Sequence, residues 1–140
     1  MTFALHSDLK RDGIAMGDFA LCRVLLINDS NYPWFVLVPK RADISDTIDL
    51  SDVDHALLWA ESKIFSRAIM DIFKGEKLNV AALGNMTPQL HIHHIVRYKN
   101  DAAWPGPIWG KLALMPYGCA ETETIRNKLS NFEIEGFELA

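Results

Sequence analysis

Hydrophobic residues form two nearly continuous runs early in the chain, and each run predicts a β-strand. The first run covers residues 19–27 (FALCRVLLI) and the second covers residues 34–38 (WFVLV). The segment between them, residues 28–33 (NDSNYP), is rich in Asn, Asp and Pro, which are typical of turns. Two strands joined by one turn predict an antiparallel hairpin.

A helical period replaces this pattern after the polar connector that covers residues 40–50. Apolar residues recur every three or four positions from Val53 to Ile72, which predicts a long amphipathic helix. Ser51 and Asp54 resemble a capping box at its start, and Gly75 supplies a stop signal after its last turn. This helix is the longest regular element that the sequence predicts.

A second pair of strands follows the helix. Residues 78–83 (LNVAAL) and 89–97 (QLHIHHIVR) are the two strands, and the turn between them contains Gly and Pro. A short helix is expected over residues 119–131. The order hairpin, helix, hairpin predicts an α+β domain in which one long helix packs on a face of an antiparallel sheet.

Composition narrows the class of protein. The 140 residues suit a single domain over residues 1–140, with 49% hydrophobic and 23% charged residues. A net charge of −4 without a basic patch argues against nucleic acid as a partner, and the apolar runs fall well short of a membrane span. Two cysteines without CxxC spacing and no secretion signal predict free thiols and a cytoplasmic protein.

Three of the five histidines lie within four positions of the last predicted strand. Because side chains of a strand alternate between its faces, one face carries Gln89, His91, His93, Ile95 and Arg97. A neutral imidazole attacks phosphorus well when one nitrogen is free and a hydrogen bond at the other fixes the tautomer. His91 lies between two polar neighbours on this face and is the best-surrounded candidate nucleophile.

This strand resembles the signature of the histidine-triad (HIT) family of nucleotide hydrolases and transferases, which alternates His-φ-His-φ-His-φ-φ after a Gly-containing loop. The segment 35–41 (FVLVPKR) before the long helix, together with Asn79 and Gly84, resembles the family as well. The match covers residues 19–99 and leaves 100–140 as a C-terminal extension. The resemblance implies a HIT-like fold and chemistry at a nucleotide phosphate.

Two registers of the motif are possible. In one, His91 is the first histidine, His93 is the nucleophile and Ile95 replaces the third histidine. In the other, Gln89 takes the first place, His91 is the nucleophile and His93 is third. The second register is favoured because it leaves Arg97 where the family often ends its motif with an arginine.

The resemblance implies a catalytic set and a binding set. His91, His93 and Gln89 form the catalytic set, in which His91 attacks the α-phosphorus of a nucleotide derivative and water then releases a nucleoside monophosphate. Leu26 and Trp34 are expected to border the base, and the segment 104–109 either covers the substrate or packs at a subunit boundary. The substrate-binding set is Asn85, Asn79, Asn28, Thr87 and Arg97.

Other expectations also follow from the resemblance. It implies a small-molecule nucleotide as the only ligand, no metal, no cofactor and a homodimer. Met86 departs from the Ser or Thr that the family often has near this position, which affects the choice of leaving group. His94 replaces an ordinary aliphatic residue, and it is either buried with its hydrogen bonds satisfied or placed at a subunit interface.

Two other functions compete with this hydrolase. A His-x-His pair on a strand is also a metal-binding device, although no Asp or Glu shares the histidine face as a further ligand. A non-catalytic nucleotide-binding module on the same fold is the second alternative, because Gln89 and Met86 depart from the family pattern. Metal content distinguishes the first alternative, and binding without turnover distinguishes the second.

Overall fold

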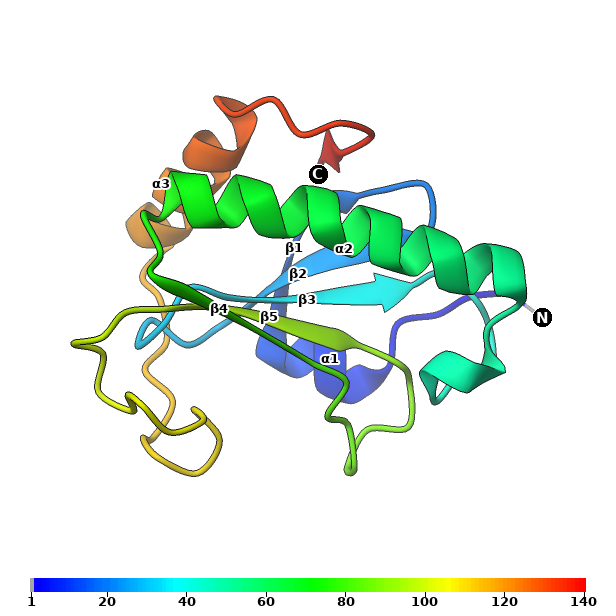
Figure 1. Cartoon of the computed structure of the whole chain (residues 1–140), viewed down its shortest axis with the longest axis horizontal. Helices are drawn as coiled ribbons and strands as arrows, with labels where there is room; N and C mark the ends of the chain where they lie inside the picture. The colour runs from blue at the N-terminus through cyan, green and yellow to red at the C-terminus, as the bar shows by residue number, and fades with distance from the viewer. Residues whose placement is uncertain (1) are drawn as a thin grey trace.

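A six-stranded antiparallel sheet forms the centre of the protein, for which a computed structural model describes residues 2–140 (Figure 1). The strand order is β4-β5-β3-β2-β1-β6, and each neighbouring pair is antiparallel. The two predicted hairpins join through pairing of β3 with β5, in which Val36 lies opposite His93. The strands are β1 Gly13–Asp18, β2 Cys22–Ile27, β3 Trp34–Pro39, β4 Lys77–Ala81, β5 Ile92–Arg97 and β6 Glu138–Leu139.

The long predicted helix is α2, Asp52–Ile72, and it crosses one face of the sheet (Figure 1). Its N-cap is Ser51, whose hydroxyl oxygen accepts a hydrogen bond of 3.1 Å from the backbone N–H of Asp54. Two smaller helices, α1 (Ser7–Asp12) and α3 (Cys119–Ser130), and one 3-10 turn, η1 (Thr47–Asp49), complete the helical structure of the described residues. The α+β class and the helix-on-sheet arrangement are therefore confirmed.

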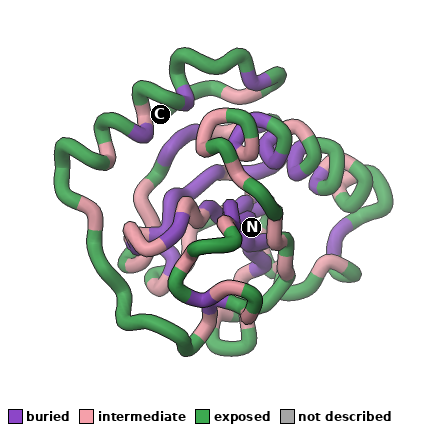
Figure 2. Tube along the Cα trace, turned by 60° about the vertical axis from the view of Figure 1, so that its left-hand side comes forward, coloured by how far each residue is buried: buried purple, intermediate pink, exposed green. Residues whose placement is uncertain are grey.

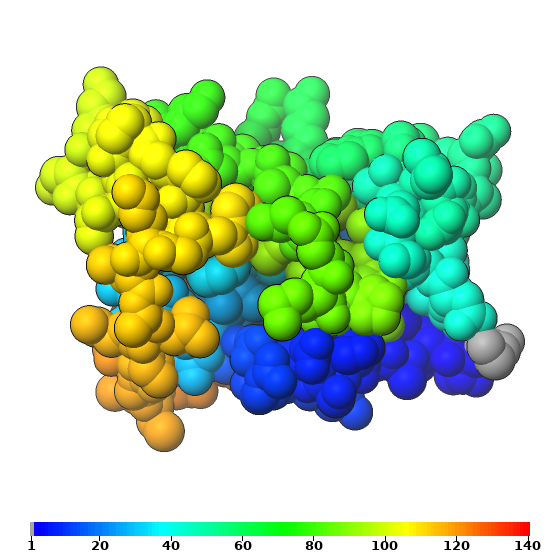
Figure 3. Space-filling view, turned by 90° about the horizontal axis from the view of Figure 1, so that it is seen from below, coloured from blue at the N-terminus to red at the C-terminus, as the bar shows by residue number. Residues whose placement is uncertain are grey.

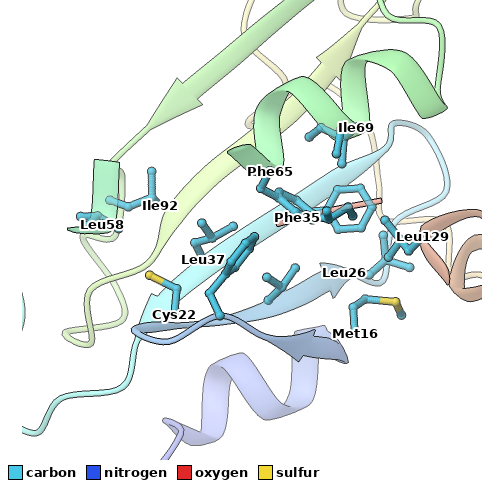
Figure 4. Packing of buried hydrophobic residues seen from close by; sticks show 14 of the residues in the cluster. Met16, Cys22, Leu26, Phe35, Leu37, Leu58, Phe65, Ile69, Ile92 and Leu129 are labelled. Atoms are coloured by element: carbon cyan, nitrogen blue, oxygen red, sulfur yellow. The ribbon is translucent and has the colours of Figure 1, made fainter. Parts of the chain in front are cut away.

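The main hydrophobic core lies between α2 and the sheet. Phe65 of α2 meets Phe35 of β3 edge to face, with ring centroids 5.2 Å apart (Figure 4). Ile125 and Leu129 of α3 pack into the same core, as the pattern of residues 119–131 predicts. Figure 2 shows the buried positions following the strands and the inner side of α2. This main core lies on the α2 side of the sheet.

A different set of segments covers the opposite face of the sheet. Leu9 of α1 packs with Leu25 of β2 and Val36 of β3 in a second, smaller cluster. Ile95 of β5 packs there as well, against Ile108 from the chain that follows β5. In Figure 1, α1 and this later segment lie below the sheet and α2 lies above it. The predicted histidine face is thus turned away from the main core.

The sequence pattern does not predict α1, β1 or β6. β1 carries two glycines and only a short apolar stretch, so it lacks a strand signature. Gly17 is required where β6 crosses, because a Cβ atom at this position would lie 2.3 Å from the carbonyl oxygen of Glu138. The first predicted strand also begins later than expected, at Cys22, because Phe19 and Leu21 are buried in the turn before it.

The helices and the two cysteines bear on the expectations drawn from composition. Across residues 2–140, none of the helices combines the length and the hydropathy needed to cross a bilayer. Cys22 is buried and Cys119 is exposed, and both are free thiols, as the sequence predicts.

Candidate active site

A cavity of about 390 Å³ lies on the face of the sheet opposite α2. Its size is at the small end of the range for ligand pockets, roughly 300–1,000 Å³. Figure 3 shows this side of the molecule, where the blue N-terminal residues, the green segment before β5 and the yellow-to-orange segment meet. The residues that form its walls are Asp8, Leu9 and Asp12 of α1, Ile27, Trp34, the loop 83–87, His91, His93, Trp109 and Leu114.

His91 presents one free ring nitrogen to this cavity. Its Nδ1–H donates a hydrogen bond of 2.7 Å to the backbone carbonyl of Gln89, which places the proton on Nδ1. Nε2 has no hydrogen-bond partner among the described residues, although the side chain is only 7% exposed. The ring also lies against Gly84, where a Cβ atom would come within 2.8 Å of Cε1. His91 is therefore held with Nδ1 engaged by the backbone and Nε2 toward the cavity.

His93 differs because both of its ring nitrogens already have partners. Nε2–H donates to the carbonyl oxygen of Leu83 at 2.7 Å, and Nδ1 accepts from the indole N–H of Trp34 at 3.0 Å. Burial lowers the pKa of His93 to about 4, and this exceeds the opposite effect of the hydrogen bond to Leu83. The side chain is neutral near pH 7 and has no nitrogen left for a ligand.

Aromatic rings fix the two histidines relative to each other. The rings of His91 and His93 meet edge to face, with centroids 4.9 Å apart. Trp109 packs edge to face on His93 at 5.2 Å, and Trp34 lies 5.8 Å from His93 on the other strand. Trp109 belongs to the proline-rich segment, so that segment forms a wall of the cavity. Neither imidazole is able to rotate without displacing an aromatic neighbour.

The side chain of Gln89 points to the N-terminal segment and lies outside the cavity walls. Its Oε1 accepts a hydrogen bond of 2.8 Å from the backbone N–H of His6, and its Nε2 donates to the carbonyl of Ala4 at 2.9 Å. His6 is the N-cap of α1, so the amide of Gln89 attaches the start of α1 to the end of the loop. Only the backbone carbonyl of Gln89 contacts the candidate nucleophile.

The loop after β4 brings two of the predicted binding residues to the cavity. Asn85 and Thr87 both line it, and Thr87 donates its hydroxyl proton to a carboxylate oxygen of Asp8 at 2.8 Å. Met86 also lines the cavity but is 94% exposed. Asn85 and Thr87 therefore line the same cavity as His91, and their role in binding stays a prediction.

Arg97 and Asn79 lie at the far end of the strands, away from the cavity walls. The guanidinium of Arg97 is buried and donates to Asp101 at 2.8 Å, to the side-chain oxygen of Asn79 at 2.8 Å and to the carbonyl of Gly106 at 2.9 Å. The ion pair with Arg97 lowers the pKa of Asp101 to about 2. This network holds the segment after β5 against the sheet.

Asn28 also bonds within the protein. Its side-chain oxygen accepts a hydrogen bond of 2.8 Å from the backbone N–H of Tyr117, and the residue is not part of the cavity walls. The expectation that Leu26 borders the base is wrong, because Leu26 faces the main core under α2. Its neighbour Ile27 lines the cavity instead, as the alternation of side chains along β2 requires.

His94 is buried on the side of the sheet that faces α2. Its Nδ1–H donates to the carbonyl of Ile92 at 2.9 Å, and its Nε2 accepts from the hydroxyl of Ser62 on α2 at 2.7 Å. Of the two expectations for this residue, the buried and fully hydrogen-bonded one is confirmed. Burial lowers the pKa of His94 to about 4, so it is neutral near pH 7.

Several residues of the cavity walls lie outside any motif or period, so the sequence does not predict them. Asp8, Leu9 and Asp12 lie about 80 residues from the histidines in the chain, and Leu114 lies beyond the proline-rich segment. The segment 8–12 (DLKRD) has one apolar residue among four charged ones, so it shows no hydrophobic period that would predict α1. As for a metal, residues 2–140 contain no group of three His, Cys, Asp or Glu side chains placed to bind one.

The chain is similar to proteins of one known family, both in sequence and in structure. The family model described as HIT domain matches residues 10–100. A crystal structure of a histidine triad protein from Bradyrhizobium japonicum superposes with a TM-score of 0.91 and 46% identity, covering 94% of this chain and 98% of the other. None of the curated proteins compared with the chain matches it.

Two further crystal structures give the same result. A histidine triad protein from Marinobacter aquaeolei VT8 has a TM-score of 0.91 and 45% identity, covering 94% of this chain and 96% of the other. One from Sinorhizobium meliloti 1021 has a TM-score of 0.90 and 39% identity, covering 93% of this chain and 96% of the other.

Proposed function

The chain belongs to the HIT family, and from this premise we propose that it hydrolyses nucleotide derivatives at the α-phosphate through a covalent nucleotidyl group on His91. Members of the family typically bind nucleotides and act as hydrolases or transferases. The observation that carries the proposal is the unpartnered Nε2 of His91, which faces the cavity from a ring whose tautomer is fixed by Gln89.

The reaction has two displacement steps. In the first, the lone pair of His91 Nε2 forms a P–N bond while the bond from phosphorus to the leaving group breaks. In the second, water attacks phosphorus, the P–N bond breaks and its electrons return to Nε2, and the nucleoside monophosphate leaves. The proton on Nδ1 stays in place in both steps, bonded to the carbonyl of Gln89.

His93 and Gln89 orient and stabilise His91 in this proposal, and neither forms a covalent bond to the substrate. The carbonyl of Gln89 partly compensates the positive charge that the imidazole gains when Nε2 is phosphorylated. His93 orients the ring of His91 and holds the carbonyl of Leu83, which precedes the glycine packed on His91. Backbone N–H groups near Asn85 and the side-chain amide of Asn85 donate hydrogen bonds to the phosphoryl oxygens, while Thr87, whose hydroxyl proton goes to Asp8, holds the loop in place.

The remaining predicted binding residues have an indirect role in the proposal. Arg97 and Asn79 hold the segment that carries Trp109, and Asn28 holds the backbone of Tyr117, close in the chain to Leu114. The apolar walls, Ile27 and Trp109 among them, suit the planar base of a nucleoside. We further infer a homodimer and a cytoplasmic location; the edge of β4, which has no neighbouring strand within residues 2–140, is the inferred contact.

Turnover by wild type and His91→Ala tests the proposal, with a chelator present throughout. The substrates are dinucleoside polyphosphates and adenosine phosphoramidates, and the product measured is the nucleoside monophosphate. We expect wild type to release it and His91→Ala to lose at least roughly a thousandfold in kcat, as nucleophile removal does elsewhere. His55→Ala is the matched control, since His55 is exposed on α2, and it retains wild-type activity.

Mass spectrometry adds a direct test of the intermediate. After brief exposure of wild type to substrate and acid-free digestion, we expect the nucleotidyl mass on the peptide that contains His91. An adduct on His93 alone would assign the other register of the motif. Nucleotide binding without turnover in wild type would favour the non-catalytic module, for which the exposed Met86 and the engaged amide of Gln89 argue.

A further inference from the structure

The walls of the cavity carry two carboxylates and no cationic side chain. Asp8 and Asp12 of α1 belong to the described residues that line it, and none of the others is a Lys or Arg. His93 adds no positive charge, because burial lowers its pKa. A site with this charge attracts a positively charged group and repels an anionic one.

Asp8 is held next to the loop that faces the candidate nucleophile. One of its carboxylate oxygens accepts the hydroxyl proton of Thr87 at 2.8 Å. Thr87 in turn lies close to Gly84, because a Cβ atom on Gly84 would be 3.3 Å from the carbonyl oxygen of Thr87 and 2.8 Å from His91. Asp8 thus belongs to the loop side of the cavity, next to the segment that packs on His91.

Neighbouring charges leave the negative charge of Asp8 largely uncompensated. Arg11 forms a two-point ion pair with Asp12, with both N–O distances 2.9 Å, and reaches Asp8 only at 3.5 Å. His6 lies 3.8 Å away, but its Nδ1 accepts the backbone N–H of Asp8 and so carries no proton. The three charges Asp8, Arg11 and Asp12 therefore sum to one negative charge beside the loop.

We propose that Asp8 selects substrates by the charge of their leaving group, so that a cationic amine is preferred to a neutral amine and both are preferred to an anionic group. The inference rests on the proposed function and names its substrate class as phosphoramidates of amines that carry a second, protonated amino group. A polyphosphate leaving group brings several negative charges to a wall that already has one.

Hydrolysis of such a phosphoramidate proceeds in two displacements at phosphorus. His91 Nε2 forms a bond to phosphorus, the P–N bond to the amine breaks, and the amine nitrogen takes one proton from solvent as it leaves. Water then attacks phosphorus, its oxygen stays in the nucleoside monophosphate, and its proton returns to solvent. The ammonium at the other end of the leaving group stays charged throughout and interacts with Asp8.

A set of adenosine phosphoramidates that differ only in leaving group tests the proposal. The leaving amines are a diaminoalkane, an alkylamine and an amino acid of matched chain length, and a diadenosine polyphosphate is added as a fourth substrate. For a charge pair about 6 Å apart, Coulomb's law gives about threefold in water and about a hundredfold at the effective dielectric constant of a protein surface. For a pair in an open cavity we expect an intermediate value, so that kcat/KM falls about tenfold from the cationic to the neutral amine, and again to the anionic one. Added salt reduces these ratios.

Asp8→Asn identifies the residue that is responsible. Its amide oxygen still accepts the hydroxyl proton of Thr87, so the contact to the loop remains while the charge is lost. We expect the variant to bring the three phosphoramidates within about threefold of one another. Asp71→Asn, which makes the same charge change on an exposed part of α2, keeps the wild-type ratios.

Failure of the proposed function and failure of the role of Asp8 give different results. If no substrate is turned over, or if turnover does not depend on His91, the proposed function fails. If turnover depends on His91 but the anionic amine or the polyphosphate is the best substrate, or if Asp8→Asn keeps the wild-type ratios, the role of Asp8 is wrong and the hydrolase remains.

Discussion

Three neighbouring histidines each donate one ring N–H to a backbone carbonyl, and they differ in the partner of the second nitrogen. The second nitrogen of His91 faces the cavity, that of His93 accepts from Trp34, and that of His94 accepts from Ser62. One side chain type therefore gives the proposed nucleophile, a ring held at both nitrogens and a buried link to α2. The tautomer of each ring follows from its contacts, because a carbonyl only accepts.

Trp34→Phe tests whether the hydrogen bond from the indole N–H of Trp34 keeps His93 neutral. The variant keeps an aromatic ring but removes the only donor to His93 Nδ1, so this nitrogen becomes free to take a proton. We expect the pKa of His93 to rise above about 4, while burial still holds it below its usual value of about 6.5, and kcat to fall at a higher pH than in wild type as the ring becomes charged. An NMR titration of the His93 ring measures the first effect.

Trp59→Phe is the matched control for this experiment, because Trp59 lies on α2 at 39% exposure, packs its ring against His55 and does not line the cavity. A pKa for His93 that stays near 4 in Trp34→Phe would mean that burial alone keeps the ring neutral. The hydrogen bond from the indole would then have no effect on the charge of the site.

At the scale of elements, β5 links the site to the core. Its alternation sends His93 and Ile95 to the cavity side and Ile92, His94 and Val96 to the side of α2, as the period of two predicts. His94 is the one polar member of the core side, and Ser62 is its partner on α2. A change in the packing of α2 therefore reaches the backbone that carries His93.

The two buried histidines make the stability of the fold depend on pH. The pKa of each is lowered to about 4 in the folded protein, whereas the unfolded chain takes up these protons near pH 6.5. Their contribution to the free energy of unfolding is complete above about pH 6.5 and is lost as the pH falls toward 4. Each histidine lowers this free energy by about 1.4 kcal/mol per pH unit within that window.

Urea unfolding between about pH 7.5 and pH 4.5 measures this dependence. The double variant Ser62→Ala, His94→Leu removes one of the two histidines without leaving the Ser62 hydroxyl unpaired, so we expect the slope of the free energy of unfolding against pH to be halved. His55→Ala, at an exposed position, keeps the wild-type slope. A slope in the double variant equal to that of wild type would contradict the assignment of His94.

Sequence patterns predict the elements that have a strong period and miss those that do not. α2 has apolar residues on one face through 21 residues, and its cap at Ser51 is as expected. β1 and β6 depend on contacts between residues far apart in the chain, and Gly17 has no side chain to mark its strand. The motif locates His91, but the walls formed by α1 and Leu114 follow only from the tertiary fold.

The whole molecule leaves one long edge of its sheet unpaired within the described residues. β4 is the first strand in the order, and Val80 on it is 40% exposed, as is Leu83 just beyond it. Backbone N–H and C=O groups of an unpaired strand readily pair with another chain. This edge is the surface through which the inferred homodimer is expected to form.

Val80→Lys tests the homodimer. A lysine on an exposed edge strand disfavours pairing with a second copy, because two like charges meet there. We expect wild type to sediment as a dimer and the variant as a monomer at equal concentration. Val53→Lys makes the same change at a 76% exposed position of α2 and leaves the dimer intact. A wild-type protein that sediments as a monomer at all concentrations would contradict the proposal.

The cavity is assembled from stretches that are far apart in the chain, namely α1, Ile27 and Trp34 of the first hairpin, the segment 83–93 and the segment 109–114. During synthesis a chain grows from its N-terminus, so a ribosome-bound chain of about 100 residues already contains every histidine. It still lacks Trp109 and Leu114, which form one wall. The ring of His91, the proposed nucleophile, is therefore enclosed only after the segment 109–114 has emerged and folded back over it.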